Sequence, residues 1–425
     1  MLISFSLANF RSFKHKQTID LTLATKLKKT HPSNIFATPN KQVPKLLKSV
    51  ALYGPNASGK SNLIKGFCNC YSMIIANQRQ RGDKILLFEP FLLDDKADCQ
   101  PTEYEIDFIA SNDVRYVYSF AFDANKIHYE RLESYENKKS STKKLIYEIG
   151  FEKDEIYHKK LLEESNLFNR IEENIHIFEN TKNNLFLNIN INNGSSMFNP
   201  VYDWFKNSVD AMFNHDDYAI NSFLWIKENK EKLLKLIKKF DLSIVDIDII
   251  EINLPSHIAE NQNIPQDRLR KTYQPYKTYQ PYFIHKTNEG KAKIFATNQI
   301  SEGTLNLITL VPQLFKILNI GGILFFDELD RSIHPDILVE LVKMFHDTEI
   351  NQHNAQLVFT AHNDILLDKN YNLFSRDQVW FASKDDVSQS SQLYCLKQFN
   401  NKRSSENIAS RYRDFEYGAR PFIAR

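Results

Sequence analysis

Hydrophobic and polar residues alternate near the beginning of the chain and again further along. Apolar side chains recur at every second position in residues 2–9 and 17–24, which predicts a β-hairpin. Residues 102–133 show the same period, with Tyr and Phe at alternating positions. This alternation is typical of strands that bury one face. We therefore predict an antiparallel β lobe within residues 1–133.

Continuous apolar runs elsewhere predict a second kind of strand, buried on both faces as in a parallel sheet. These runs are residues 49–53, 323–326, 357–360 and 379–381. Apolar residues at helical spacing follow the first two runs and predict helices at 60–78 and 335–345. The pattern as a whole indicates an α/β protein whose mixed sheet is combined with an antiparallel lobe.

The middle of the chain has a different character. Lys and Glu clusters and an Asn-rich stretch fill much of residues 134–255, and residues 224–240 predict a helix with Leu233 and Ile237 on one face. We interpret the lysines of this helix as a solvated face rather than a DNA-binding surface. No sustained heptads flank the segment, so we expect a compact helical lid and no coiled-coil arm. The predicted domains are 1–133, 134–255 and 256–425.

Composition narrows the partners that the chain is expected to have. The net charge of +2 over 425 residues gives no global basic field, so DNA is possible as a partner but is not indicated by charge. No apolar run approaches the roughly 18 residues needed to span a bilayer. The opening residues have no basic region or small-residue cleavage site. We expect a cytoplasmic protein without a membrane partner. A duplicated Thr-Tyr-Gln-Pro-Tyr motif at residues 272–282 is read as an extended loop.

A glycine-rich loop lies between the first buried run and the helix after it. It reads Gly54, Pro55, Asn56, Ala57, Ser58, Gly59, Lys60, Ser61 and Asn62. Glycines at both ends let the backbone curl so that its amides, together with the helix N-terminus, bind phosphate oxygens. Lys60 is expected to contact the β- and γ-phosphates, and Ser61 to bind Mg²⁺. The sequence therefore predicts an ATP-type nucleotide ligand with Mg²⁺.

Two carboxylates follow the apolar run at 323–326. Asp327, at the end of the predicted strand, is suited to orient Mg²⁺, and Glu328 to polarise an attacking water. Asp327 and Ser61 are thus the predicted metal ligands, and Glu328 is the predicted catalytic base. A Ser-Glu-Gly-Thr motif at residues 301–304 and a histidine, His362, just after the run at 357–360 complete the set of motifs.

In this order, the motifs resemble the ABC-type ATPase heads of the SMC/Rad50/RecF class. More narrowly, the chain resembles bacterial AAA-family ATP-binding proteins related to the RloA and OLD-type ATPases, many of them found in phage-defence loci. The opening Phe5–Phe13 and the tail Tyr417–Ile423 resemble the same group. The resemblance spans nearly the whole chain and is weakest in residues 134–255.

The resemblance implies roles for further residues. Ser301, Glu302, Gly303 and Thr304 would form the signature loop, which contacts the nucleotide bound to another subunit. Asp330 would line that interface, and His362 would be the switch histidine that senses the γ-phosphate. Arg11 or Ser12 would lie near the phosphates. The implied assembly is a head-to-tail dimer or a higher even oligomer.

The resemblance also implies a function. The leading hypothesis is an ATPase that acts as the sensor or regulatory subunit of an anti-phage defence system, controlling a separately encoded nuclease or toxin in response to a phage-derived trigger. The alternative is a RecF/SMC-like DNA-binding clamp used in repair or maintenance. A self-contained OLD-type nuclease is disfavoured because only 63 residues follow His362. A small-molecule P-loop kinase would not need the signature and histidine motifs.

Overall fold

The computed structural model divides the chain into two compact units. Unit 1 comprises Met1–Phe213, Ile317–Asp330 and Leu338–Arg425, and unit 2 comprises Asn214–Lys316 and Arg331–Ile337. The residues that the structure describes are 1–23, 31–76, 79–94, 96–97, 99–136, 142–152, 155–159, 168–212, 219–240, 244–254, 276–399 and 407–419.

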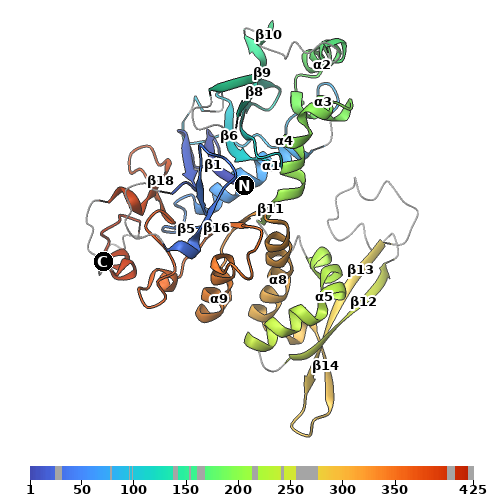
Figure 1. The fold of residues 1–425 in the computed structure, drawn as a ribbon, viewed down its shortest axis with the longest axis vertical. Helices are drawn as coiled ribbons and strands as arrows, with labels where there is room; N and C mark the ends of the chain where they lie inside the picture. Colours follow the sequence, from blue (N-terminus) through green and yellow to red (C-terminus); the bar gives the residue numbers. More distant parts are fainter. Residues whose placement is uncertain are drawn as a thin grey trace. The chain divides into compact units, whose positions relative to one another are not determined.

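Unit 1 contains a six-stranded sheet in the order β11-β15-β16-β5-β17-β18 (Figure 1). Its strands are β11 (Val209–Met212), β15 (Ile323–Phe326), β16 (Gln356–Thr360), β5 (Ser49–Tyr53), β17 (Val379–Lys384) and β18 (Ser391–Cys395). The first five strands are parallel, and β18 returns antiparallel to β17. All five residues of β5 are buried, as the apolar run predicts. The carboxyl ends of β15, β16 and β5 therefore meet at one edge of the sheet, where ligands bind in open α/β sheets.

The antiparallel lobe is a seven-stranded sheet in unit 1, in the order β10-β9-β8-β7-β6-β1-β2. Its strands are β1 (Leu2–Ala8), β2 (Gln17–Asp20), β6 (Thr102–Ile109), β7 (Arg115–Phe122), β8 (Ile127–Tyr135), β9 (Lys143–Glu152) and β10 (Glu155–Lys159). The predicted hairpin is confirmed, with Phe5 opposite Ile19, although its second strand ends at Asp20. The strands predicted in residues 102–133 are confirmed as β6, β7 and β8.

Helix α1 (Lys60–Ile75) lies between the two sheets of unit 1. Phe67 of α1 stacks on Phe325 of the parallel sheet, with 3.6 Å between ring centroids. On its other side, the same ring meets Phe5 of the antiparallel sheet edge-on at 5.1 Å. Burial of these three rings fixes the helix that follows the glycine-rich loop against both sheets.

The expectation of a helical lid from residue 134 onward is wrong for its first part. Strands β9 and β10 extend the antiparallel sheet, and the predicted boundary at residues 133/134 falls inside β8. Helices follow only after these strands: α2 (Phe168–Thr181), α3 (Phe186–Asn192) and α4 (Asn199–Ser208). The last of these helices, α4, buries the side chains of Trp204 and Phe205.

A buried carboxylate joins this sheet to α3. Glu130 of β8 is fully buried and accepts hydrogen bonds from the hydroxyls of Tyr118 and Tyr147 and from the backbone N–H groups of Phe186 and Leu187. Burial raises the pKa of the Glu130 carboxyl, and the four donors oppose that rise. All four donors point at one side chain, so Glu130 fixes the start of α3 against the sheet.

Unit 2 contains helix α5 (Ala219–Phe240) and a three-stranded sheet. Its strands, in spatial order, are β12 (Ile244–Leu254), β13 (Tyr276–Lys286) and β14 (Ala292–Ala296). The helix predicted at 224–240 is confirmed, with Leu233 and Ile237 buried. The helix bends at Asn229, whose backbone angles are not helical. The prediction of an extended loop at residues 272–282 is wrong from residue 276, where β13 begins. Residues 272–275 lie outside the described ranges.

The remaining strands and α-helices complete the two units. They are β3 (Ile35–Ala37), β4 (Lys45–Leu47), α8 (Glu302–Ile320), α9 (Pro335–His346) and α10 (Ile408–Arg413). Among the described residues, α8 is long and apolar enough to cross a membrane by length and composition alone. However, 56% of its apolar window is buried inside the protein, which is also the pattern of a core helix.

Candidate functional site

The glycine-rich loop closes tightly at both of its ends. Gly54 and Gly59 have φ angles of 155° and 106°, and Gly59 is the N-cap of α1. A Cβ atom on Gly54 would lie 2.3 Å from the backbone oxygen of Ala382, and one on Gly59 would lie 2.3 Å from Oγ of Ser391. Only glycine fits at these two positions, because the neighbouring hairpin β17–β18 presses on the loop.

Lys60 is turned back over this loop. Its side chain is buried, and Nζ donates to the carbonyl oxygens of Gly54 and Pro55 at 2.7 and 3.0 Å. Burial lowers the pKa of Lys60, while the negative charges of Asp327, Glu328 and Asp330 act to raise it. The loop lysine and the carboxylates at the end of β15 therefore act on one another electrostatically, as one cluster.

Thr360 organises the two carboxylates that follow β15. Its Oγ1 donates to Oδ1 of Asp327 at 2.6 Å and accepts from the backbone N–H of Glu328 at 2.7 Å. Thr360 is fully buried and Asp327 nearly so. Glu328 has a φ of 51°, an uncommon backbone conformation for a residue other than glycine. Thr360 thus holds both the carboxylate of Asp327 and the strained backbone of Glu328.

Sequence reasoning gave Thr360 no role. The one available signal is its polarity at the end of an otherwise apolar strand, since Leu357, Val358 and Phe359 precede it. Because β16 lies between β5 and β15, its last residue reaches the carboxylates at the carboxyl edge of the sheet.

His362 faces the predicted base. Its Nε2 lies 3.4 Å from Oε1 of Glu328. The loop that carries it is held by Asp330, whose Oδ2 accepts hydrogen bonds from the backbone N–H groups of His362 and Asn363 at 2.7 and 2.6 Å. In this chain, the carboxylate of Asp330 is therefore directed to the histidine loop, and its buried Oδ1 has no hydrogen-bond partner among the residues that the structure describes.

Ser12 lies beside the loop. Its Oγ accepts from Nδ2 of Asn62 at 2.8 Å and from Oγ of Ser391 at 2.7 Å. These two acceptor bonds leave the Ser12 hydroxyl proton available for a further acceptor. Ser12 therefore ties the first turn of α1 to the hairpin β17–β18.

Arg11 makes a separate connection. Its guanidinium forms an ion pair with Glu89, and its backbone N–H donates to the carbonyl oxygen of the same residue at 2.8 Å. Arg11 is thus already paired within the chain.

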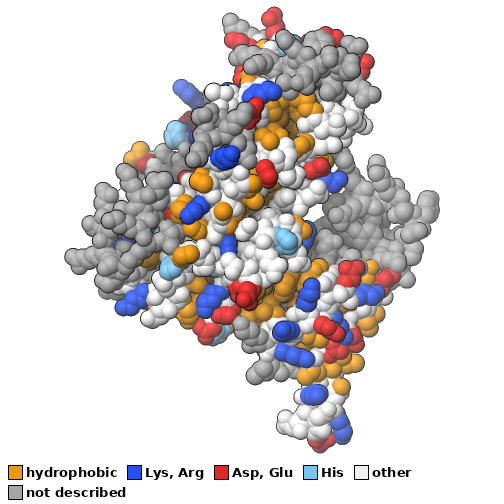
Figure 2. Space-filling view, viewed as in Figure 1, with side chains coloured by type: hydrophobic (Ala, Val, Ile, Leu, Met, Phe, Trp, Pro, Cys, Tyr) orange, Lys and Arg blue, Asp and Glu red, His pale blue; other side chains and the backbone are white. Residues whose placement is uncertain are grey.

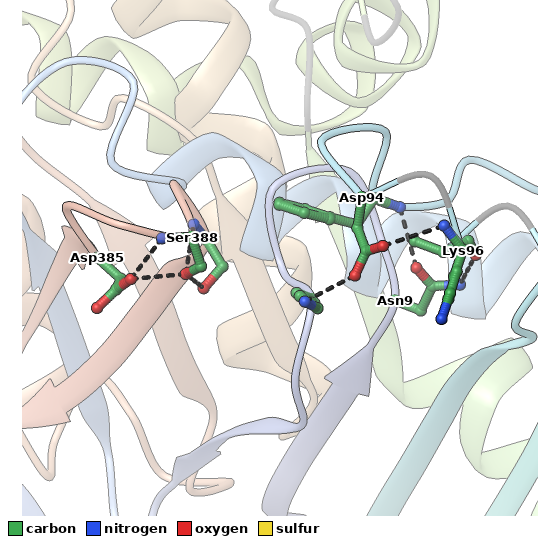
Figure 3. Close-up of polar contacts among 9 residues, drawn as sticks. Asn9, Asp94, Lys96, Asp385 and Ser388 are labelled. Carbon is green, nitrogen blue, oxygen red and sulfur yellow. Dashed lines mark hydrogen bonds and ion pairs between the residues drawn. The ribbon is translucent and has the colours of Figure 1, made fainter.

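Two clusters of polar contacts lie near Ser12 and in the β17–β18 hairpin (Figure 3). Asn9 donates from Nδ2 to the backbone oxygens of Ala97 and Gln100, and Asp94 binds Lys14 at 2.7 Å. In the turn between β17 and β18, Asp385 accepts from the backbone N–H and the hydroxyl of Ser388, both at 2.7 Å. These bonds lower the pKa values of Asp94 and Asp385.

The other loop residues differ in exposure. Asn56 and Ala57 are exposed, and Pro55 and Ser61 are half-buried. Ser58 is buried, and within the described part of the chain its Oγ has no hydrogen-bond partner. Ser61 stands in the first turn of α1. A Mg²⁺ ion bound with a nucleotide needs one or two protein oxygens beside phosphate and water ligands. The hydroxyl of Ser61 and the carboxylate of Asp327 fit that requirement.

The predicted signature residues lie in unit 2. Ser301 and Thr304 join their hydroxyls at 2.7 Å, and the backbone N–H of Thr304 donates to Oγ of Ser301 at 3.2 Å, in the manner of a helix cap. Glu302 lies 3.9 Å from Arg331. A Cβ atom on Gly303 would lie 2.3 Å from the backbone oxygen of Ser332, so the motif packs closely on the segment after Asp330.

In unit 1, the structure brings together the loop 54–62, Ser12, the Asp327–Glu328 pair, Asp330 and His362. It places the signature motif 301–304 in unit 2, beside residues 331–332.

The fold is similar to that of an SMC head bound to the C-winged helix domain of ScpA. The two sequences are 13% identical, the match covers 93% of this chain and 97% of that chain, and the TM-score is 0.39. The fold is also similar to a RecF–ATP structure, with 14% identity, 85% of this chain and 92% of that chain covered, and a TM-score of 0.34. A third similar structure is an Smc head from Pyrococcus furiosus with an extended coiled coil. Its identity is 10%, the match covers 98% of each chain, and the TM-score is 0.40.

No curated protein matches the sequence. One family model matches residues 49–368, which include the glycine-rich loop, both carboxylates and His362. The chain therefore belongs to the family described as "AAA domain, putative AbiEii toxin, Type IV TA system".

Proposed function

We propose that this protein binds and hydrolyses ATP with Mg²⁺ and uses that cycle to regulate a separate effector in anti-phage defence. The observation that carries the ATPase proposal is the cluster at the carboxyl edge of the parallel sheet. There, Lys60 lies under the electrostatic influence of Asp327 and Glu328, and Glu328 faces His362 at 3.4 Å. Membership in the AAA-domain family supports nucleotide binding as the shared activity.

Each residue of the cluster has a distinct task in this proposal. The backbone amides of residues 54–59 bind phosphate oxygens, and Lys60 leaves its two loop carbonyls to contact them. Ser61 and Asp327 hold Mg²⁺, which neutralises charge on the phosphates. Glu328 accepts a proton from the attacking water. His362, placed against Glu328, reports whether the γ-phosphate is present.

The proposal extends to assembly. A signature motif that acts on a nucleotide held by another copy makes the contact reciprocal, so two sites form when two chains meet head to tail. Ser301, Glu302, Gly303 and Thr304 would supply this contact. The nucleotide then controls dimerisation, and dimerisation changes the surface that is offered to the effector.

The defence role is the finer part of the proposal. The family description names a putative AbiEii toxin of a type IV toxin–antitoxin system, which supports a role in defence or in a toxin–antitoxin pair. We propose that this protein is cytoplasmic and that it holds or releases a separately encoded partner according to nucleotide state, with a phage-derived trigger.

One experiment tests both parts. The chain is expressed alone, and with the product of its neighbouring gene, in cells challenged with phage. We expect protection only from the pair, and loss of protection in Lys60→Ala and Glu328→Gln. The purified Glu328→Gln variant should bind ATP but hydrolyse it at least about 100-fold more slowly.

The exposed Glu349 provides the matched control, and Glu349→Gln should behave as the wild type. Full protection by this chain alone would contradict the partner model. A wild-type hydrolysis rate in Glu328→Gln would contradict the role of the base.

A DNA clamp is the second candidate, and helix α5 is the observation that favours it. Lys227, Lys232, Lys235 and Lys238 are exposed on this helix. Figure 2 shows Lys and Arg side chains over α5, with acidic side chains among them. If the clamp is correct, double-stranded DNA should stimulate ATP hydrolysis at low salt, and replacing these lysines by Gln should remove the stimulation. No response to DNA favours the effector switch.

A further inference from the structure

The segment 407–419, which includes α10, reaches the loop of His362. We propose that Arg413 is a positioning residue of the ATPase site and that its contact with Asp364 sets the placement of His362. This inference rests on the proposed ATPase function. Nothing in the motifs of the chain assigns a role to either residue.

The contact between the two side chains is bidentate. Nε of Arg413 lies 2.6 Å from Oδ2 of Asp364, and Nη2 lies 3.0 Å from Oδ1. Parallel N–H···O bonds of this kind fix orientation as well as distance. Asp364 begins a short 3₁₀ helix (Asp364–Leu367), which Asn363 caps by accepting a hydrogen bond from the N–H of Ile365 at 3.0 Å. The arginine therefore binds the first residue of a capped turn, two residues after His362.

The loop of His362 is thus fastened on both sides. Asp330 accepts from the backbone of His362 and Asn363, and Arg413 binds the next residue along the chain. Asp330 belongs to the segment that carries Glu328. Arg413 belongs to a segment about 50 residues further along the chain. Without Arg413, the loop keeps only its attachment to Asp330, and the separation between His362 and Glu328 is less closely determined.

Aromatic packing holds the helix that carries Arg413. The ring of Tyr412, its neighbour on α10, stacks on Phe381 with an interplanar angle of 12° and a centroid distance of 5.7 Å. It also meets Tyr53 at 5.8 Å, and Tyr53 is the residue just before Gly54. The hydroxyl of Tyr412 donates to the backbone oxygen of Ala419 at 3.1 Å. Helix α10 therefore rests on the strand that enters the phosphate-binding loop.

Exposure separates a positioning role from a structural one. The side chain of Arg413 is 54% exposed and that of Asp364 is 23% exposed. Ion pairs at such sites contribute little to folding stability because water and salt screen them. Removing the pair should leave the protein folded, whereas a small displacement of a catalytic group lowers the rate strongly.

The test compares Arg413→Gln, Asp364→Asn and the double variant. We expect each single change to lower kcat for ATP by roughly tenfold. The affinity for ATP should stay at the wild-type value, because Lys60 and the loop are untouched. The double variant should be no slower than the slower single variant, since both changes break the same contact. The matched control is Arg411→Gln, which removes an ion pair with Glu416 inside the same segment.

Hydrogen–deuterium exchange adds a readout that does not need turnover. The peptide 361–367 should exchange faster in Arg413→Gln and at the wild-type rate in Arg411→Gln. Wild-type kcat together with unchanged exchange in Arg413→Gln would overturn the inference, as would an equal loss of kcat in the control. Absence of ATP hydrolysis by the wild-type protein would instead contradict the proposed function, and exchange would then decide the inference alone.

Discussion

At the scale of single residues, Thr360 shows how a small side chain can control two functional groups. Its one hydroxyl donates to Asp327 and accepts from the backbone of Glu328. A buried hydroxyl that makes both bonds fixes the direction of the carboxylate and stabilises the positive φ of the next residue. The proposed metal ligand and the proposed base therefore share one support.

Thr360→Val keeps the shape of the side chain and removes both bonds. We expect a loss of about 1–3 kcal/mol in the free energy of unfolding, because one buried and one partly buried polar group lose their partner. The Mg²⁺ concentration for half-maximal ATP hydrolysis should rise about 10–100-fold, as when a residue that supports a metal ligand is removed. Magnesium titrations of the ATPase rate measure this. Thr360→Ser retains the hydroxyl and should stay near the wild type; an unchanged magnesium requirement in Thr360→Val would refute the role.

At the scale of elements, a polar network joins α9 to the first residue of β5, at the end of the strand away from the glycine-rich loop. The hydroxyl of Ser49, the first residue of β5, lies 2.7 Å from Nε2 of His346 at the end of α9. Gln378, just before β17, donates to the backbone oxygen and to the hydroxyl of Ser49. Burial, and to a lesser extent the charges of Lys48 and His31, lowers the pKa of His346 to about 3. The imidazole is therefore neutral in the folded protein at neutral pH.

This lowered pKa predicts the direction of a stability change with pH. Between about pH 6.5 and pH 3, the unfolded chain binds a proton at His346 that the folded chain does not, so stability falls as pH falls. The loss from this residue approaches about 1.4 kcal/mol per pH unit. His346→Gln cannot take up the proton, so its stability relative to the wild type should improve on acidification. Urea unfolding at several pH values measures this, with the exposed His353→Gln as the control. Parallel pH curves for the wild type and His346→Gln would contradict it.

The sequence predicted elements best where their period was uninterrupted. The apolar runs of β5, β15 and β16 bury both faces, so composition alone identifies them. Strand β9 lies in the segment predicted to be helical, because Lys and Glu residues flank and interrupt its alternating apolar positions. Tyr147 and Ile149 are fully buried in it, while charged residues occupy both of its ends. Tertiary burial of alternate positions, and not local propensity, makes this segment a strand.

In the candidate site, too, the residues within sequence motifs were predicted, and those that depend on tertiary contacts were not. The loop, Asp327, Glu328 and His362 belong to recognisable motifs, and the structure places them in one unit. Thr360 and Arg413 act through partners 33 and 49 residues away, respectively, in the sequence. No spacing rule links residues that meet only because β16 lies between β5 and β15, or because α10 packs beside Phe381.

At the scale of the whole molecule, the signature motif predicts an assembly that depends on nucleotide. Glu328→Gln with ATP and Mg²⁺ should shift the protein toward a dimer or a higher even oligomer, because a bound γ-phosphate that is not hydrolysed retains the contact between copies. Light scattering with and without ATP measures the shift. Glu302→Arg, added to Glu328→Gln, should prevent it. Glu289→Arg, at another exposed site of unit 2, should not. A strict monomer with ATP at saturating concentration would contradict the assembly.

The place of β5 in its sheet also determines when the protein can become active during its synthesis. β5 lies between β16 and β17, which the ribosome makes about 300 residues later. At roughly 5–20 residues per second, this strand waits about 15–60 s for its neighbours. Throughout that time, five residues destined for the interior stay without their final partners. A nascent chain that stops before Gln356 therefore carries a phosphate-binding loop on an unpaired strand and should not retain nucleotide.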